Sequence, residues 1–135
     1  MSDSIQDVFT GERFVPGIED EKLTIEHYQR YVSIKELVKD KIVVDAACGE
    51  GYGSNILSQY AKKVIGLDID EEAVDRANMA YSSEKVNYIV GDVTKLPFED
   101  NSVEVFVSFE TIEHIPEVAQ AEFLKEINRV LKEDG

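Results

Sequence analysis

The segment that most constrains how this chain folds is residues 42–53, which read I-V-V-D-A-A-C-G-E-G-Y-G. A short apolar run ends at Asp45, and a turn follows in which Gly49, Gly51 and Gly53 are two residues apart. A strand, a tight glycine turn and a helix in this order present backbone N–H groups and a helix N-terminus to a ligand. Glycine suits this turn because it adopts positive φ and, without a Cβ, allows a ligand to approach the backbone closely. We therefore predict a ligand-binding turn in this segment.

The glycine spacing argues against two familiar phosphate-binding loops. A dinucleotide fingerprint reads G-x-G-x-x-G, whereas this turn reads G-x-G-x-G. A P-loop needs a G-x-x-x-x-G-K-[ST] run, and the sequence contains none. An NAD-dependent dehydrogenase or epimerase is therefore disfavoured, although it stays open as an alternative.

Strand-like and helix-like patterns alternate along the rest of the chain. Residues 42–46, 63–68, 86–90 and 103–109 are short apolar runs, as in strands of a parallel sheet that is covered on both faces. Residues 52–61, 70–81 and 116–131 have apolar residues at helical spacing, and so does a first helix from Thr24, its N-cap, to about Lys39–Lys41. This alternation predicts an α/β fold with a doubly wound parallel sheet and right-handed crossovers.

Acidic residues follow the second and third predicted strands. Asp68 ends the second strand, 17 residues after Gly51, where an acidic side chain accepts the hydroxyls of a ribose. Asp70 is the better N-cap for the next helix, which leaves Asp68 for a ligand. Ile69 either packs on an adenine ring or belongs to the core. Because parallel strands end at one edge of a sheet, we expect the glycine turn, Asp68 and Asp92 to lie together there.

Composition limits the remaining possibilities. The 135 residues suffice for one small domain, and the net charge of −14 opposes binding to nucleic acid or to an anionic membrane. No apolar run is long enough for a membrane helix, and no signal peptide is visible. The single cysteine, Cys48, cannot form an internal disulfide, so we expect a cytoplasmic protein. No cluster of His, Cys and carboxylate residues has metal-ligand spacing, and we predict no metal site.

Taken together, these motifs resemble the class I S-adenosylmethionine (SAM) dependent methyltransferases, in particular the ubiquinone and menaquinone biosynthesis type. The glycine turn is similar to their D-x-G-x-G-x-G motif, with Ala47 in place of the first glycine. The G-D-V-T-K-L-P-F run of residues 91–98 and the F-E-T-I-E-H-I run of residues 109–115 also have counterparts in that family. The resemblance implies SAM as cofactor, with S-adenosylhomocysteine (SAH) as its product.

The resemblance also implies roles for individual residues. Asp92 would bond the adenine amino group, with the adjacent backbone N–H on a ring nitrogen, and Glu110 and His114 would act as bases or shape the site near the transferred methyl group. Apart from the resemblance, we expect His27, Tyr28 and Arg30 in the first helix to reach the methionine end of SAM, with a core position as the alternative for Tyr28. The predicted cofactor-binding residues are Asp45, Ala47, Gly49, Gly51, Asp68, Ile69, Asp92, Val93 and Phe109.

The implied fold is the Rossmann-like methyltransferase sheet, of which this chain carries strands in the order 3-2-1-4 and lacks strands 5-7-6. We expect an N-terminal arm at residues 1–23, a SAM-binding domain at residues 24–135, and an exposed fourth strand through which chains self-associate. The implied function is methyl transfer to O, N or C of a small-molecule acceptor, with this chain as an inactive SAM-binding half. A non-catalytic SAM- or nucleotide-binding module is the alternative.

Overall fold

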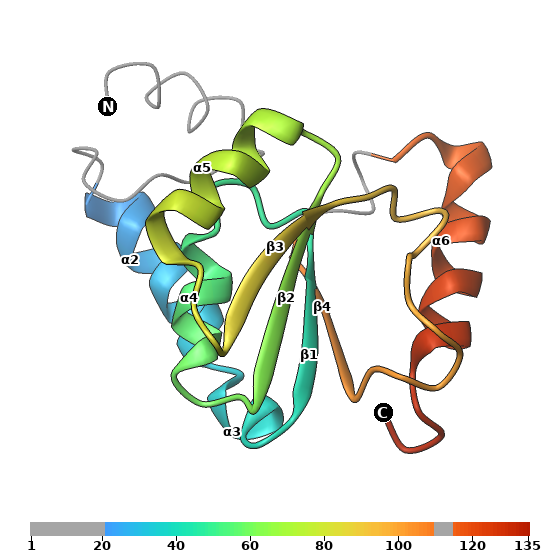
Figure 1. Cartoon of the computed structure of the whole chain (residues 1–135), viewed down its shortest axis with the longest axis horizontal. Helices are drawn as coiled ribbons and strands as arrows, with labels where there is room; N and C mark the ends of the chain where they lie inside the picture. Colours follow the sequence, from blue (N-terminus) through green and yellow to red (C-terminus); the bar gives the residue numbers. More distant parts are fainter. Residues whose placement is uncertain (1–20, 110–114) are drawn as a thin grey trace.

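The computed structural model describes residues 21–109 and 115–135, which form one parallel sheet with helices on both faces (Figure 1). The elements, in chain order, are α2 (Glu21–Val32), α3 (Lys35–Val38), β1 (Ile42–Ala46), α4 (Tyr52–Ser58), β2 (Lys63–Asp68), α5 (Glu71–Tyr81), β3 (Val86–Val90), β4 (Val105–Ser108) and α6 (Glu117–Val130). Helices α2, α4 and α5 cover one face of the sheet, and α6 covers the other (Figure 1).

The four strands lie in the order β3-β2-β1-β4, and every neighbouring pair is parallel. The central strand β1 pairs with β2 from Ile42 opposite Lys63 to Ala46 opposite Leu67. All four strands therefore end at the same edge of the sheet. This arrangement confirms the predicted α/β class and the 3-2-1-4 order.

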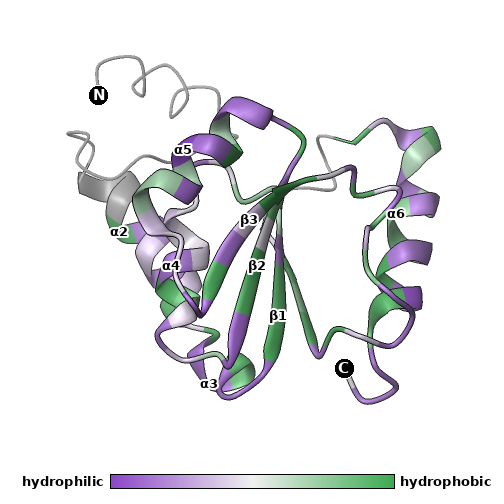
Figure 2. Cartoon of the chain, in the orientation of Figure 1, coloured by the Kyte–Doolittle hydropathy of each residue, from purple (hydrophilic) through white to green (hydrophobic). Residues whose placement is uncertain are grey.

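Two apolar cores lie on opposite faces of the sheet because successive side chains of a strand point to opposite sides. Val43 belongs to the core under α4 and α5, together with Leu57 and Val74, whereas its neighbour Val44 belongs to the core under α6, together with Val130. The strands are accordingly hydrophobic over much of their length, with hydrophilic segments on β2 and β3, and the helices carry both hydrophilic and hydrophobic residues (Figure 2). Parallel strands between two helical layers require such near-continuous apolar runs.

The predicted helix boundaries were right in part. Asp70 is the N-cap of α5, and its carboxylate accepts hydrogen bonds from the backbone N–H groups of Glu72 and Ala73 at 3.0 and 3.3 Å. The prediction of one helix from Thr24 to the lysines at 39–41 was wrong. Helix α2 begins at Glu21 and ends at Val32, and the short helix α3 follows it.

The fourth strand is shorter than the apolar run predicted. Residues 105–108 pair with β1, whereas Val103 makes only an isolated parallel bridge to Leu131. The backbone N–H and C=O of Val103 bond to Val130 and Lys132, so the C-terminal end of α6 holds this residue instead of a neighbouring strand. Within the described part of the chain, β4 is an edge strand, as predicted.

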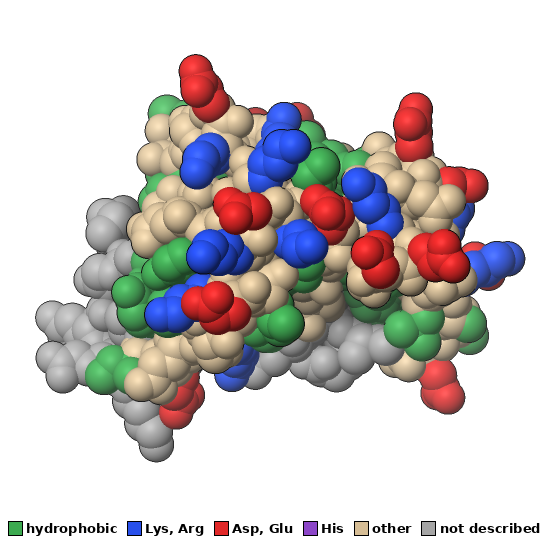
Figure 3. All heavy atoms as spheres, turned by 90° about the horizontal axis from the view of Figure 1, so that it is seen from below, with side chains coloured by type: hydrophobic (Ala, Val, Ile, Leu, Met, Phe, Trp, Pro, Cys, Tyr) green, Lys and Arg blue, Asp and Glu red, His purple; other side chains and the backbone are tan. Residues whose placement is uncertain are grey.

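The face at which the strands begin carries Lys, Arg, Asp and Glu side chains side by side, with apolar side chains between them (Figure 3). Charges of both signs keep this surface hydrated and give it no dominant sign. Ligands of open parallel sheets bind at the opposite edge, beyond the carboxyl ends of the strands. No helix in the described part of the chain is both long and apolar enough to span a membrane.

Candidate functional site

The loops after β1, β2 and β3 meet at the carboxyl edge of the sheet and bring most of the predicted cofactor-binding residues together. The turn after β1 contacts β2 directly, because the N–H of Cys48 donates to the carbonyl of Leu67 at 3.0 Å. The loop after β3 contacts the end of β2 in the same way, through the N–H of Gly91 and the carbonyl of Asp68 at 3.0 Å. The site is thus assembled by the parallel topology and the crossovers.

The glycine turn follows β1 through three left-handed residues. Ala47, Gly49 and Gly51 have φ values of 55°, 56° and 88°. Glycine adopts this conformation freely, whereas alanine does so at a cost of about 1–2 kcal/mol. The departure of Ala47 from the glycine of the family motif therefore strains the backbone of the turn.

Two glycines of the turn make room for protein side chains, and not for a ligand as the sequence led us to expect. A Cβ on Gly51 would lie 2.7 Å from Cβ of Ala77 and 2.8 Å from the ring of Tyr88. A Cβ on Gly53 would lie 1.9 Å from the ring of Tyr31. The turn is therefore packed tightly against α5, β3 and α2 from within the protein.

Polar side chains from distant parts of the chain fix the turn in place. The hydroxyl of Tyr88 donates to the carbonyl of Gly51 at 2.7 Å, and burial raises the pKa of this phenol. Arg76 on α5 makes a bidentate ion pair with the largely buried Glu50, with both N–O distances 2.7 Å. Bidentate pairs of this kind are strong and directional. The sequence alone did not identify Tyr88 or Arg76 as functional residues. Their partners Gly51 and Glu50 are 37 and 26 positions away, and no motif links residues at such separations.

The carboxylate of Asp68 lies beside the turn. One oxygen accepts the N–H of Gly49 at 2.8 Å, and the other accepts the N–H of Asp70 at 2.9 Å. A carboxylate accepts about four hydrogen bonds, so capacity remains for two ribose hydroxyls. The next side chain, Ile69, is 73% exposed, which rules out the core alternative and leaves an apolar surface beside the carboxylate.

Asp92 and Val93 lie in a tight turn after β3. Both the N–H and the hydroxyl of Thr94 donate to one carboxylate oxygen of Asp92, at 2.8 and 2.7 Å. These hydrogen bonds lower the pKa of Asp92, so its exposed carboxylate is charged at neutral pH. A charged acceptor is suited to a donor such as an exocyclic amino group.

Asp45 differs from the other two acids because it is completely buried near the end of β1. Its carboxylate accepts the hydroxyl of Ser54 at 2.7 Å and that of Tyr31 at 3.5 Å. Burial raises the pKa of Asp45 from 3.8 to about 7, against the lowering effect of these two hydrogen bonds. The side chain links β1 to α4 and α2 inside the protein, and its contact with a cofactor stays a prediction.

Helix α2 covers the end of the site near β4. The rings of Tyr31 and Phe109 meet edge to face with centroids 5.0 Å apart, and the guanidinium of Arg30 lies 5.9 Å from the Phe109 ring centre. Tyr28 is 48% exposed on the same helix. Of the residues predicted near the methyl group and the acceptor, Glu110 and His114 lie outside the described residues.

We find no candidate metal centre in residues 21–109 and 115–135. Nowhere in these ranges do three or more His, Cys, Asp or Glu side chains converge in a way that would hold a metal ion. Cys48 is buried, and burial raises its pKa well above the ordinary value, so the thiol is protonated at neutral pH. The candidate site therefore consists of carboxylates, backbone N–H groups and apolar side chains.

Comparisons with known proteins agree with this arrangement. A family model described as a methyltransferase domain matches residues 44–135. A probable SAM-dependent methyltransferase of Mycolicibacterium smegmatis is 36% identical over 127 residues, which are 93% of this chain and 48% of that protein. The chain spans about half the length of the curated relatives it matches.

Solved structures show the same fold. A protein from Pyrococcus horikoshii is 32% identical, with a TM-score of 0.75 over 88% of this chain and 57% of that one. A Haloferax volcanii methyltransferase, solved in complex with the Trm112 activator, is 27% identical, with a TM-score of 0.70 over 84% of this chain and 51% of its own. The sheet order, the glycine turn and these matches together place the chain in the family of class I SAM-dependent methyltransferases.

Proposed function

We propose that this chain is the cofactor-binding part of an enzyme that transfers the methyl group of SAM to O, N or C of a small-molecule acceptor. The observation that carries the proposal is that Asp68 accepts the N–H of Gly49 in the glycine turn, while the loop that carries Asp92 begins with a hydrogen bond from Gly91 to the carbonyl of Asp68. The two carboxylates thus follow adjacent strands, and the exposed Ile69 comes directly after one of them. A nucleoside has hydroxyls, an aromatic face and an amino group to match these side chains. The family to which the chain belongs supports the choice of SAM over other nucleosides.

The residues present fit such a cofactor. Asp68 would hold the ribose hydroxyls, because both of its oxygens are already oriented by backbone N–H groups and retain acceptor capacity. Ile69 would pack on one face of the adenine, and Asp92 would accept its amino group beside the N–H of Val93. The turn with Ala47, Gly49 and Gly51 would pass next to the remainder of the cofactor molecule.

SAM supplies an activated methyl group on a sulfonium, so the protein's task is largely to hold the two reactants in line. Phe109 would form an apolar wall at the end of β4, and Glu110 or His114 would accept a proton where the acceptor carries one. Tyr28, Arg30 and His27 on α2 would close the methionine end. The roles of Glu110 and His114 follow from the family resemblance, and the contacts of Tyr31 and Arg30 with Phe109 support the placing of α2 at this end of the site.

Calorimetric titration of the chain with SAM, SAH and NAD tests the proposal. SAM and SAH should bind, whereas NAD should bind at least about tenfold more weakly, because the G-x-G-x-G turn lacks the spacing of a dinucleotide loop. Equal affinity for NAD would indicate a dinucleotide-binding protein. If SAM, SAH and NAD all fail to bind, the proposed cofactor site is contradicted. Binding of SAM without transfer to any acceptor would favour a non-catalytic module.

We propose that the edge of β4 binds a second copy of this chain. Val105 and Phe106 on this strand are only half-buried, and a strand edge with apolar side chains recruits further strands. We expect self-association through this edge. Sedimentation of the chain over a range of concentrations tests it, with Val105→Lys as the variant that should restore the monomer. A wild-type monomer at every concentration would contradict this expectation.

A further inference from the structure

The cofactor-side loop between β3 and β4, residues 91–104, has almost no regular structure of its own. Its first part is a turn in which the carboxylate and carbonyl of Asp92 accept hydrogen bonds from Thr94 and Lys95. These bonds shape the turn but do not attach it to the rest of the protein. The direction in which Asp92 points therefore depends on what anchors the loop on either side of the turn.

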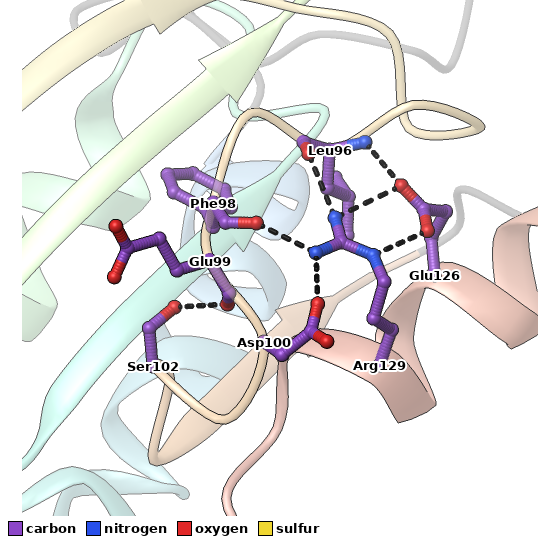
Figure 4. A network of polar contacts seen from close by, with 7 residues as sticks. All are labelled: Leu96, Phe98, Glu99, Asp100, Ser102, Glu126 and Arg129. Atoms are coloured by element: carbon purple, nitrogen blue, oxygen red, sulfur yellow. Dashed lines mark hydrogen bonds and ion pairs between the residues drawn. The ribbon is translucent and has the colours of Figure 1, made fainter.

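The upstream anchor is the hydrogen bond from the N–H of Gly91 to the carbonyl of Asp68. The downstream anchor is a polar network around Arg129, a residue of α6 more than 30 positions away (Figure 4). Two of its guanidinium N–H groups donate to the carbonyls of Leu96 and Phe98, at 2.9 and 2.8 Å. The loop is thus clamped at Leu96, directly after the turn of residues 92–95 that carries Asp92.

Glu126, one helical turn before Arg129, completes the network. Its carboxylate takes the Nε–H of Arg129 at 2.7 Å and, with the other oxygen, the N–H of Leu96 at 2.8 Å. Asp100 accepts a further guanidinium N–H at 2.8 Å. Figure 4 shows the backbone of Leu96 held from both sides, its N–H by Glu126 and its C=O by Arg129. The buried Leu96 side chain fixes the same residue in the core under α6.

We propose that Arg129 and Glu126 are positioning residues for the cofactor. They hold the loop that carries Asp92 in place and do not contact the cofactor themselves. The proposal rests on the proposed function, in which Asp92 accepts the adenine amino group. The planar guanidinium reaches two loop carbonyls and two carboxylates at once, which a lysine ammonium with three donors on a flexible stem cannot reproduce. The network also ties this loop to α6, the helix that follows the predicted acceptor-side residues Glu110 and His114.

The first test measures the loop without any cofactor. Amide hydrogen exchange of Thr94, Lys95 and Leu96 is compared in wild type, Arg129→Gln and Arg129→Lys, with Lys125→Gln as the control. Lys125 is exposed on the same helix, and its substitution changes the net charge equally. We expect exchange of these three amides to rise roughly tenfold in both Arg129 variants while the amides of β1 and β2 stay protected. The control should match wild type.

The second test measures adenine selectivity. Wild type should bind SAH roughly tenfold more tightly than the inosine analogue, in which an oxo group replaces the adenine amino group. The Arg129→Gln variant should lose most of this preference, because its affinity for SAH should fall while its affinity for the analogue stays nearly unchanged. If Arg129 had a purely structural role, the substitution would lower the affinity for both ligands equally and leave the ratio of the two affinities unchanged.

Each outcome bears on the proposal separately from the proposed function. Wild-type loop protection in Arg129→Gln, or a wild-type selectivity ratio in that variant, overturns the positioning role. Failure of the wild type to bind SAH overturns the proposed function, whereas failure of the wild type to prefer SAH over the analogue overturns the Asp92 contact and the positioning role with it. Circular dichroism and melting establish that each variant is folded, and Glu126→Gln, which keeps an acceptor for Leu96, replaces Arg129→Gln if that variant is unfolded.

Discussion

Asp45 should make the chain less stable as the pH rises from about 4 to about 7. Burial raises the pKa of this carboxyl from 3.8 to about 7 in the folded chain, whereas in the unfolded chain it titrates near its ordinary value. Between these values the folded state holds a proton that the unfolded state has released. Raising the pH through this window therefore favours unfolding, and the penalty is complete above pH 7.

The magnitude follows from the shift of about three pKa units, which at about 1.36 kcal/mol per unit amounts to about 4 kcal/mol. Asp45→Asn removes the titration and keeps an acceptor for Ser54, while the hydroxyl of Tyr31 can accept from the new amide. At pH 5, about one unit above the unfolded pKa, the variant should already be more stable than wild type by about 1.6 kcal/mol. At pH 8, above both pKa values, the difference should reach about 4 kcal/mol.

Urea unfolding followed by circular dichroism at several pH values from 5 to 8 measures this difference. The neighbouring ionisable groups Tyr31, Cys48 and Asp68 are present in both proteins, so their contributions largely cancel in the comparison. Asp75→Asn, which removes an exposed carboxylate of α5, is the matched control and should show a nearly constant difference from wild type. A stability difference between Asp45→Asn and wild type that is the same at pH 5 and pH 8 would refute the reasoning.

Three further substitutions test the turn and its neighbour. Asp68→Ala should lower SAM affinity by about 1.5–3 kcal/mol, because it removes charge-assisted hydrogen bonds to the ribose; unchanged affinity by calorimetry in a folded variant would contradict that role. Ala47→Gly should raise the free energy of unfolding by up to about 1 kcal/mol by relieving a left-handed alanine, and urea titration shows whether it does. Gly51→Val should lower the melting temperature, since its Cβ would overlap Ala77 and Tyr88; a variant that melts like wild type would show that the packing adjusts.

The residues of the glycine turn show where sequence reasoning reached its limit. The positions of the glycines correctly indicated a turn with positive φ after β1. The reason for two of them was misjudged, because Gly51 and Gly53 leave space for Tyr88, Ala77 and Tyr31, which lie far away in the sequence. Which atoms occupy the place of a missing Cβ depends on how the helices pack, and no local pattern records that.

The sequence by itself determined the strands β1, β2 and β3 to the residue, because each is a short, mainly apolar run bounded by turn signals. It also determined the cap at Asp70 and the order of acidic residues along the carboxyl edge, since both depend on neighbours in the chain.

Only the tertiary structure decided how these residues are supported. Arg76 meets Glu50, Arg129 meets Leu96, and the buried Asp45 takes its pKa of about 7 from the protein packed around it. Hydrogen bonds and burial depend on distances of a few ångströms between segments that the crossovers bring together. Local periodicity fixes which face of a helix or strand is apolar. The packing of elements that are distant in the sequence fixes which hydrogen-bond partners and how much burial each polar side chain has.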